Sequence, residues 1–309
     1  MKRKIAVLLS LSLMVILSNC GEAPKIDEYY HHGYYEYKFI DKHKQSVSFC
    51  GVSSSWKEEV SDTLYIPETI YSLNVVKIGT PRYDFSNYKG IRKIIIPSTV
   101  KIIEDNAFKG AYSLEEISIP DSITSIGRGA FAGCSALKEI TLPASVKSIG
   151  ERAFAGCKSL VSVNAEKTAI TEIKALTFFA QTAYDNGDSV LKICLLPPSL
   201  TSIGESAFGN CKRLENIAIP DKVATIEKEA FGGCFSLKEI TLPASLKNIG
   251  ENAFRDCSEL THVTFADTNS WYVKYPSSSS WTAVTVTNPA TNAQYLKNTY
   301  KDFYWSKKH

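Results

Sequence analysis

The chain has 309 residues, of which 44% are hydrophobic and 22% are charged, and its formal net charge is +3. The first 19 residues contain three basic residues and no acidic one, so the rest of the chain holds 32 basic and 32 acidic residues. A neutral chain offers no electrostatic basis for binding nucleic acid, or for binding a membrane through a polybasic segment. The charge therefore argues against both classes of partner.

Residues 1–19 have the form of a secretory signal peptide. A basic head at residues 2–4 precedes an apolar run over residues 5–17, which is too short to span a membrane. The sequence Leu17-Ser18-Asn19-Cys20 resembles a bacterial lipobox, in which the cysteine is lipidated and becomes the mature N-terminus. Each buried CH₂ of a lipid contributes about 0.8 kcal/mol, so a multiply acylated Cys20 is a stable membrane anchor. Asn19 departs from the small residue usual at that position, and cleavage without lipidation is the alternative.

Residues 20–33 are expected to be a tether. Fully extended, they reach less than about 50 Å, which keeps the folded part close to any membrane that holds Cys20. His31 and His32 have no Cys or acidic partner at the spacing of metal ligands, and we interpret them as a solvated pair.

Residues 34–63 are expected to be a β-hairpin that caps the N-terminal end of the following segment. Aromatic residues alternate at Tyr35, Tyr37 and Phe39, and after a polar turn Val47 and Phe49 continue the alternation. A degenerate repeat begins at residue 64.

A 23-residue pattern fills most of the chain from residue 64 to residue 265. It occurs in six copies without internal gaps, at residues 91–113, 114–136, 137–159, 191–213, 214–236 and 237–259. Its form is L-x-x-I-x-L-P-x-x-V-x-x-I-G-x-x-A-F-x-x-C-x-x, with apolar residues at positions 1, 4, 6, 10, 13, 17, 18 and 21. A period of this length is typical of a solenoid, in which each unit buries its apolar edge against the next.

Within a unit, positions 4 and 6 alternate as in a strand. In the unit that begins at Leu137, Ile140 and Leu142 are expected to point inward and Glu139 and Thr141 outward. Pro143 has no N–H group, so the strand ends before it. The spacing of positions 17, 18 and 21 predicts one turn of helix or 3₁₀-helix that returns the chain to the next strand.

The unit resembles the BspA-like, Treponema-type class of bacterial leucine-rich repeats, whose motif is LxxIxLPxxLxxIGxxAFxxC. The match covers about 200 of the 309 residues. The resemblance implies a mostly-β, curved right-handed leucine-rich-repeat solenoid, with a parallel sheet on its concave side and short helical or 3₁₀ turns. Glu104 and Glu227 stand where other copies have Gly, so this position is not expected to require a left-handed backbone. Ala111 replaces the Cys of one unit, and Cys194 replaces a strand Ile.

The unit over residues 160–190 is irregular, because it lacks the Pro and has 31 residues instead of 23. The additional residues lie mainly in the segment 179–190, which contains the turn-forming residues Asp185, Asn186, Gly187 and Asp188. Two interpretations fit this loop. It is either a tolerated surface insertion or a specificity loop for a partner.

Residues 266–309 are rich in aromatic residues and are expected to form a C-terminal cap over the last repeat. The alternative is a sugar-binding site, because aromatic rings also stack on sugars. The residues concerned are Trp271, Tyr272, Tyr275, Trp281, Tyr295, Tyr300, Phe303, Tyr304 and Trp305.

The cysteines at position 21 are expected to be buried thiols rather than a disulfide framework. In a stack of units they form a column with the strand spacing of about 4.8 Å. Their Cβ atoms are then farther apart than the ~3.8 Å that a disulfide prefers. The column consists of Cys134, Cys157, Cys211, Cys234 and Cys257.

No motif in the sequence indicates an enzyme, a cofactor site or a metal site. The chain has no Gly-rich phosphate loop, no HExxH, no GxSxG and no CxxC. His262 is the one histidine of the array, and we interpret it as a surface residue beside Glu239.

The surface of the predicted sheet is the candidate binding site, because positions 2, 3 and 5 of each strand are free of packing constraints. These positions are mostly polar, but Ile193 and Leu195 form an apolar spot next to the irregular loop. The candidate partner-binding residues are Lys93, Glu116, Glu139, Thr141, Ile193, Leu195, Glu239, Thr241 and His262 on the strands, with Asn186 and Asp188 in the loop.

Together these features predict an exported, lipid-anchored, non-enzymatic protein of the outer membrane or cell surface that binds a protein ligand. The family resemblance implies adhesion, including binding to host extracellular proteins such as fibronectin and fibrinogen. Two alternatives remain: a structural or assembly protein of the cell envelope, and a protein that binds glycans through its aromatic C-terminal region.

Overall fold

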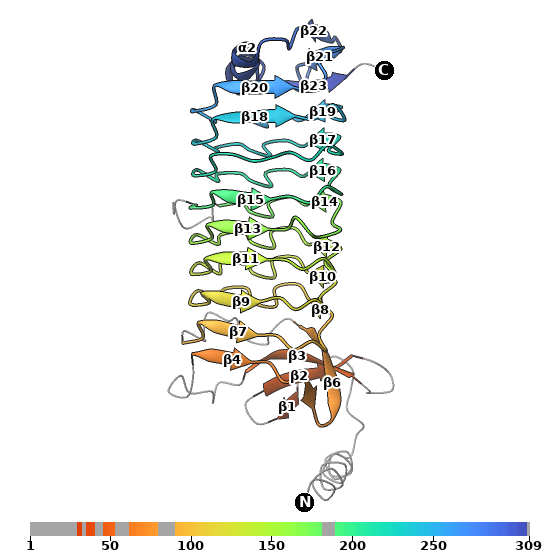
Figure 1. Ribbon diagram of the computed structural model, residues 1–309, viewed down its shortest axis with the longest axis vertical. Coiled ribbons are helices and arrows are strands. Elements are labelled where there is room, and N and C mark those ends of the chain that lie inside the picture. Colours follow the sequence, from red (N-terminus) through yellow and green to blue (C-terminus); the bar gives the residue numbers. More distant parts are fainter. Residues whose placement is uncertain are drawn as a thin grey trace, which may run out of the picture.

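The computed structural model describes residues 30–32, 35–40, 46–52, 62–79, 90–180 and 189–307. They form one elongated stack of coils, with the N-terminal strands at one end and the C-terminal elements at the other (Figure 1). Successive units lie side by side along the stack, so each unit has its sequence neighbours above and below it. The signal-peptide and Cys20 predictions lie outside the described residues.

Except in the unit that begins at Leu214, which has no first strand, the first strands lie where the alternation of positions 4 and 6 predicted them. In β11, Ile140 is buried, whereas Glu139 and Thr141 are exposed. The strands pair in parallel in three sheets, β4-β7-β9, β11-β13-β15 and β18-β20. They are β4 (Thr63–Tyr65), β7 (Lys93–Ile95), β9 (Glu116–Ser118), β11 (Glu139–Thr141), β13 (Ser162–Asn164), β15 (Ile193–Leu195), β18 (Glu239–Leu242) and β20 (His262–Phe265). We call their outer surface the first-strand face.

Each unit also has a second, short strand that the sequence analysis did not assign. Its last residue, at position 13, is buried, and neighbouring units pair in parallel, as Ile126 does with Ile149. This ladder is interrupted between β12 and β14. Its strands are β6 (Leu73–Ile78), β8 (Ile102–Ile103), β10 (Ser125–Ile126), β12 (Ser148–Ile149), β14 (Glu172–Ile173), β16 (Ser202–Ile203), β17 (Thr225–Ile226) and β19 (Asn248–Ile249), and β5 (Thr69–Ile70) pairs antiparallel with β6.

The return segment of each unit is a run of turns. The Phe131 N–H donates to the Ala153 carbonyl of the next unit at 2.8 Å, whereas the Cys134 N–H donates to the Phe131 carbonyl of its own unit at 3.1 Å. Between residues 129 and 134 the N–H groups alternate in this way. A helix or 3₁₀-helix requires each N–H to bond within its own segment. The expected helical turn is therefore replaced by turns that also join neighbouring units.

The glycine at position 14 allows two units to approach closely. Gly127 and Gly150 do not have a positive φ, which confirms that this position requires no left-handed backbone. A Cβ at Gly127 would overlap the backbone of Glu104 and Asp105, and one at Gly150 would overlap the backbone of Arg128. The glycine thus lets the backbones of adjacent coils pack against each other.

The core is built from two columns that run along the stack. The phenylalanines at position 18 stack on one another with ring centroids 5.2–5.5 Å apart, over Phe108, Phe131, Phe154, Phe178, Phe208, Phe231 and Phe254. Beside them, each position-21 thiol donates to the carbonyl of the position-18 phenylalanine in the preceding unit, as Cys157 Sγ does to Phe131 O at 3.2 Å. The seven described cysteines are buried, and none of them forms a disulfide with another described residue.

The N-terminal strands form the antiparallel hairpin that the sequence predicted. β2 (Tyr35–Phe39) pairs with β3 (Ser46–Val52), and β3 pairs in parallel with β6, so the hairpin extends the ladder of second strands. β1 (Tyr30–His32) pairs with the other edge of β2. This strand lies in the segment that the sequence analysis assigned to the tether.

The C-terminal segment covers the other end of the stack. β23 (Tyr304–Lys307) pairs antiparallel with β19 and with β21 (Trp271–Lys274), which pairs with β22 (Thr282–Val284). α2 (Pro289–Gln294), followed by η2 (Tyr295–Thr299), packs on β20. Asn292 of α2 donates to the carbonyls of Val263 and Val286. Trp271 and Trp305 are each only 2% exposed, so they lie in the core of this segment.

We expect Phe154→Ala to lower the free energy of unfolding by about 3–5 kcal/mol, because it removes a buried ring that stacks on both neighbours. The measurement is urea unfolding followed by circular dichroism. Tyr112→Ala is the matched control, since Tyr112 is 55% exposed, and its effect should stay within about 0.5 kcal/mol. Equal losses for the two variants would contradict the role of the phenylalanine column.

The buried thiols should resist thiol reagents. Burial raises the pKa of Cys157, Cys211 and Cys257 to about 12. At pH 8 only about one such thiol in ten thousand is ionised, and the thiolate is the reactive form. In the chain from residue 20 onward that carries Cys20→Ser, we expect no reaction with Ellman's reagent in the native state. All seven remaining thiols should react in guanidinium chloride. A rapidly reacting thiol in the native protein would show that the column is open to solvent.

Candidate partner-binding surface

The candidate residues on the strands all lie on the first-strand face, because positions 3 and 5 point outward from each strand. Lys93 is half-buried and the others are exposed. Asn186 and Asp188 lie outside the described residues. The residues on this face are Lys93, Glu116, Glu139, Thr141, Ile193, Leu195, Glu239, Thr241 and His262.

The structure brings some of these residues together and leaves others apart. The strand register places Lys93 beside Glu116 and Glu239 beside His262. The first pair lies in the N-terminal part of the array and the second lies on its last two first strands. The candidate residues therefore extend along the whole face instead of forming a single cluster.

In the N-terminal part of the face, the charged side chains pair with one another. Glu115 lies between Arg92 and Lys138, with N–O distances of 3.5 and 2.6 Å. The hydrogen bond from Lys138 lowers the pKa of the Glu115 carboxyl below its ordinary value, and the positive charges of Lys138 and Arg92 add to this effect. Lys93 and Glu116 form a further pair at 2.6 Å. These charges are already satisfied within the chain.

An exposed apolar patch lies at the middle of the face. Ile193 and Leu195 of β15 are 52% and 43% exposed, and Val161, which precedes β13, is 41% exposed. The carbonyl of Val161 accepts a hydrogen bond from the Ile193 N–H, so the two residues lie side by side. We call Val161, Ile193 and Leu195 the apolar patch. Sequence reasoning placed all three residues on this face but did not recognise Val161 as part of the patch.

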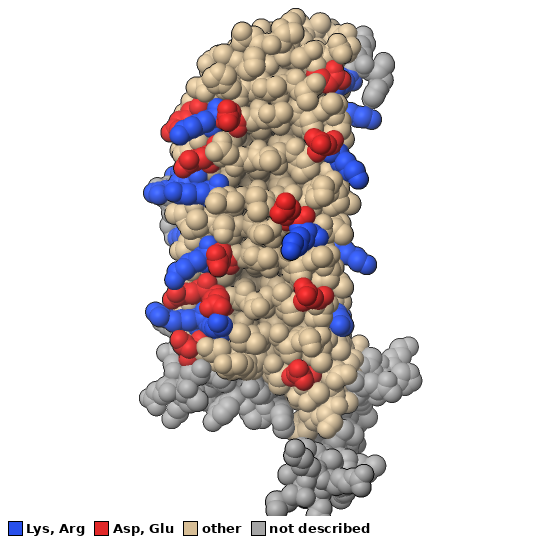
Figure 2. Space-filling model, viewed as in Figure 1, with Lys and Arg blue, Asp and Glu red and all other residues tan. Residues whose placement is uncertain are grey.

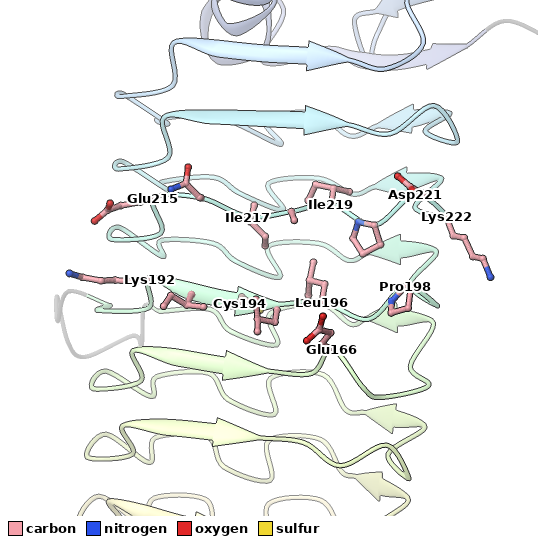
Figure 3. Close-up of a pocket in the computed structure, with 15 residues that line it drawn as sticks. Glu166, Lys192, Cys194, Leu196, Pro198, Glu215, Ile217, Ile219, Asp221 and Lys222 are labelled. Atoms are coloured by element: carbon pink, nitrogen blue, oxygen red, sulfur yellow. The ribbon is translucent and has the colours of Figure 1, made fainter.

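A groove of about 970 Å³ adjoins the apolar patch. One wall is β15 and the other is the extended segment 215–219 of the next unit (Figure 3). Ile193 and Leu195 line the first wall, and Asn216 and Ala218 line the second. Charged residues lie at both ends, with Lys192 and Glu215 at one end and Asp221 and Lys222 at the other, and Glu166 lies near Leu196 (Figure 3).

At the groove the ladder of first strands is interrupted, as it also is between β9 and β11. In several other units, the position-6 N–H donates to the position-5 carbonyl of the next unit, as in Leu142 to Asn164 at 2.8 Å and Ala165 to Leu195 at 2.9 Å. Within the described part of the chain, the equivalent bond from Leu196 is absent. Segment 215–219 is consequently not part of either adjacent sheet.

The interruption affects only the first-strand face. Behind the groove, β16 pairs with β17, and Phe208 stacks on Phe231 with centroids 5.3 Å apart. A smaller depression of about 450 Å³ lies on the other side of segment 215–219, bordered by Thr241 and His262. No sequence signal revealed this feature, since the Leu214 unit matches the repeat pattern at every apolar position.

The face is uncharged along its centre. Figure 2 shows charged side chains gathered along two margins of the array, with an uncharged band between them. The residues at position 5, which are all uncharged, are Ile95, Ser118, Thr141, Asn164, Leu195, Ala218, Thr241 and Thr264.

The described residues offer no arrangement for metal binding, since no group of three His, Cys, Asp or Glu side chains among them is placed to hold an ion. The His262 Nδ1 lies 3.0 Å from Thr261 Oγ1, and the ring is exposed on the surface. Among the described residues, no helix has the length and apolar character needed to cross a membrane.

The aromatic C-terminal segment divides into a buried and an exposed set. Trp271 and Trp305 are buried, whereas Trp281 is 40% exposed, with Lys274 Nζ 5.2 Å from its ring centroid. Tyr275 and Tyr304 are also exposed. Two of the three tryptophans considered for sugar binding are therefore core residues.

A comparison with protein families agrees with the repeat pattern of the sequence. Residues 76–186 and 179–302 match the family described as BspA type leucine rich repeat region, in six copies. The chain belongs to this family. No curated protein sequence matches the chain.

A comparison with solved structures finds bacterial leucine-rich-repeat proteins and a pneumococcal antigen, with TM-scores below 0.5. The T. pallidum leucine-rich repeat protein TpLRR is 22% identical over 75% of this chain and 91% of its own, with a TM-score of 0.49. A leucine-rich repeat protein from Bacteroides ovatus is 27% identical over 77% of this chain and 71% of its own, with a TM-score of 0.43. The pneumococcal vaccine antigen PcpA is 20% identical over 79% of this chain and 82% of its own, with a TM-score of 0.42.

Proposed function

We propose that this protein is an exported, lipid-anchored binding module that attaches to other proteins through the first-strand face. The observation that carries the proposal is the apolar patch of Val161, Ile193 and Leu195, which is solvent-exposed and borders a groove on an otherwise polar face. Contiguous exposed apolar side chains beside polar margins are typical of protein-binding sites. Membership of a leucine-rich-repeat family supports the same function.

The proposed location follows from the sequence before the array. The signal-like segment 1–19 and the lipobox-like Cys20 favour export and attachment to the outer membrane or the cell surface. The proposed ligand is a host matrix protein, and fibronectin and fibrinogen are the first candidates because the family resemblance implies them. Nothing among the described residues supports a catalytic role, and we propose no cofactor.

The apolar patch should be required for binding and dispensable for folding. We expect Ile193→Asp with Leu195→Asp to weaken binding to fibronectin or fibrinogen at least tenfold in surface plasmon resonance. The melting temperature should stay nearly unchanged, because both side chains are about half exposed already.

Ser118→Asp with Thr264→Asp is the matched control, since it adds two acidic residues at position 5 on the same face, away from the patch. Equal losses of binding in both double variants would mean that charge alone, and not the patch, determines binding. A fall of many degrees in the melting temperature would mean that Ile193 and Leu195 belong to the core. If the unmodified protein binds neither matrix protein, this choice of ligand is wrong.

The location can be tested by protease shaving of intact cells of the native organism, with mass spectrometry of the released peptides and of the Cys20 terminus. We expect peptides from the array, such as those around Leu137, in the released fraction, and an acylated Cys20. A cytoplasmic protein followed in the same samples controls for cell lysis. An array that is protected until the envelope is broken would refute adhesion and favour a structural role within the envelope.

A further inference from the structure

The C-terminal strands present a second exposed surface, separate from the first-strand face. Because β23 pairs with β19, the strands β21, β22 and β23 extend the ladder of second strands at the C-terminal end of the stack (Figure 1). Trp271 and Val273 of β21 are buried, and successive side chains of a strand point to opposite faces of the sheet. Tyr272 and Lys274 therefore point away from the core.

Lys274 lies between two exposed aromatic side chains on this surface. Tyr304 of β23 is its direct partner in the strand register, and side chains directly opposite each other share one face of a sheet, with Cβ atoms about 5 Å apart. On the side of β22, the Lys274 Nζ lies 5.2 Å from the ring centroid of Trp281. Tyr304 is 41% exposed and Trp281 is 40% exposed. We call Lys274, Trp281 and Tyr304 the cap cluster.

The cap cluster combines an exposed ring with a positive charge in a defined place. An ammonium group over an indole ring is attracted by the negative face of the ring, so Trp281 holds the end of the Lys274 side chain. The ring of Tyr304 is exposed on the other side of the same lysine. A ligand that fits this arrangement needs an apolar face and an anionic group beside it.

The charges of the C-terminal segment favour an anionic ligand. Residues 271–307 contain four lysines and one acidic residue, Asp302. Lys307 pairs with Asp267 at 2.6 Å, whereas Lys274 forms no ion pair with a carboxylate of the described residues. The positive charge of Lys274 therefore complements a negative charge on a ligand.

An acidic sugar has both of the required features. The C–H groups on one face of a pyranose ring stack on aromatic side chains, and a uronic acid carries a carboxylate at the edge of the same ring. A sugar stacked on Tyr304 would bring its carboxylate to the neighbouring Lys274, which would donate a charge-assisted hydrogen bond to it.

We infer that the cap cluster binds polysaccharide chains that contain uronic acids. Tyr304 stacks on the sugar ring, Lys274 binds its carboxylate, and Trp281 is a positioning residue that acts through Lys274. The cap cluster lies at the opposite end of the stack from the N-terminal strands (Figure 1). With the proposed anchor at Cys20, it points away from the membrane. This sugar-binding site is additional to the proposed binding of proteins by the first-strand face.

The probes are the hexasaccharide of galacturonic acid and its fully methylated ester, which have the same rings but differ in charge. A hyaluronan hexasaccharide, which contains glucuronic acid, is tested in parallel. In isothermal titration calorimetry with the chain from residue 20 onward that carries Cys20→Ser, at least one acidic hexasaccharide should bind, and galacturonate at least tenfold tighter than its ester. Binding of neither acidic hexasaccharide, or equal binding of galacturonate and ester, would overturn the inference. Binding to phosphatidylserine vesicles without binding to either hexasaccharide would overturn it too, and would identify the cap cluster as a membrane contact.

Three substitutions separate the roles within the cap cluster. Lys274→Met should weaken binding of galacturonate at least tenfold and remove the preference over the ester. Tyr304→Ala should weaken binding of both oligomers at least tenfold, whereas Tyr304→Phe should bind normally, because the ring and not the hydroxyl group makes the contact. Trp281→Ala should reduce the preference for the acid, and Trp281→Phe should restore it, because a ring again holds the ammonium group. Normal binding by both Lys274→Met and Tyr304→Ala would exclude the cap cluster as the site.

Phe235→Ala is the matched control. Phe235 is also 40% exposed, and Lys212 Nζ lies 5.8 Å from its ring centroid, so it forms a lysine–aromatic pair elsewhere on the array. This variant should bind galacturonate normally. An equal loss of binding in Phe235→Ala and Tyr304→Ala would mean that exposed rings bind the sugar without a defined site, which contradicts the inference.

The two proposed sites can be separated experimentally. Ile193→Asp with Leu195→Asp should leave binding of galacturonate unchanged, and Tyr304→Ala should leave binding of fibronectin or fibrinogen unchanged. Loss of galacturonate binding in the double variant would place the sugar on the first-strand face and overturn the inference. Binding of galacturonate by a protein that binds neither matrix protein would support the cap cluster and refute only the choice of protein ligand.

Discussion

The structure depends on hydrogen bonds and ring contacts that join each unit to the next, because no unit satisfies its own main chain. In the return segment, every second N–H donates to the neighbouring unit, and the phenylalanine ring at position 18 is covered on both sides only by its neighbours. The thiol at position 21 adds a third link, because it donates to a carbonyl of the preceding unit. A solenoid of this kind is stable as a stack and not as isolated repeats.

This dependence explains the special elements at the two ends. An end unit without a neighbour would expose free strand edges and a bare apolar face. At the N-terminal end, β3 supplies a strand to β6, and at the C-terminal end β23 does so for β19. The aromatic residues of the C-terminal segment mainly help to cover this end of the stack, since Trp271 and Trp305 are buried there. Asn292 links α2 to the last first strand through the Val263 carbonyl.

Sequence reasoning predicted the parts of the fold that have a clear local pattern and missed those that do not. The alternation around Ile140 located the first strands, and the alternation from Tyr35 to Phe49 located the hairpin. Two-residue strands such as Ser148–Ile149 are too short to show alternation, and they form because neighbouring units supply their partners. The groove was not predictable for a related reason. The Leu214 unit has the standard apolar positions, yet its segment 215–219 belongs to neither adjacent sheet.

The position of the groove shows how this fold can separate binding from stability. The second strands and the phenylalanine column hold the units together behind the groove, where segment 215–219 belongs to neither adjacent sheet. The buried side chains of positions 4 and 6 still face the core, while positions 3 and 5 face solvent. Changes at the exposed positions therefore alter the surface without removing a core contact. The stack thus tolerates gaps in the ladder of first strands, because the other ladder and the phenylalanine column continue past the groove.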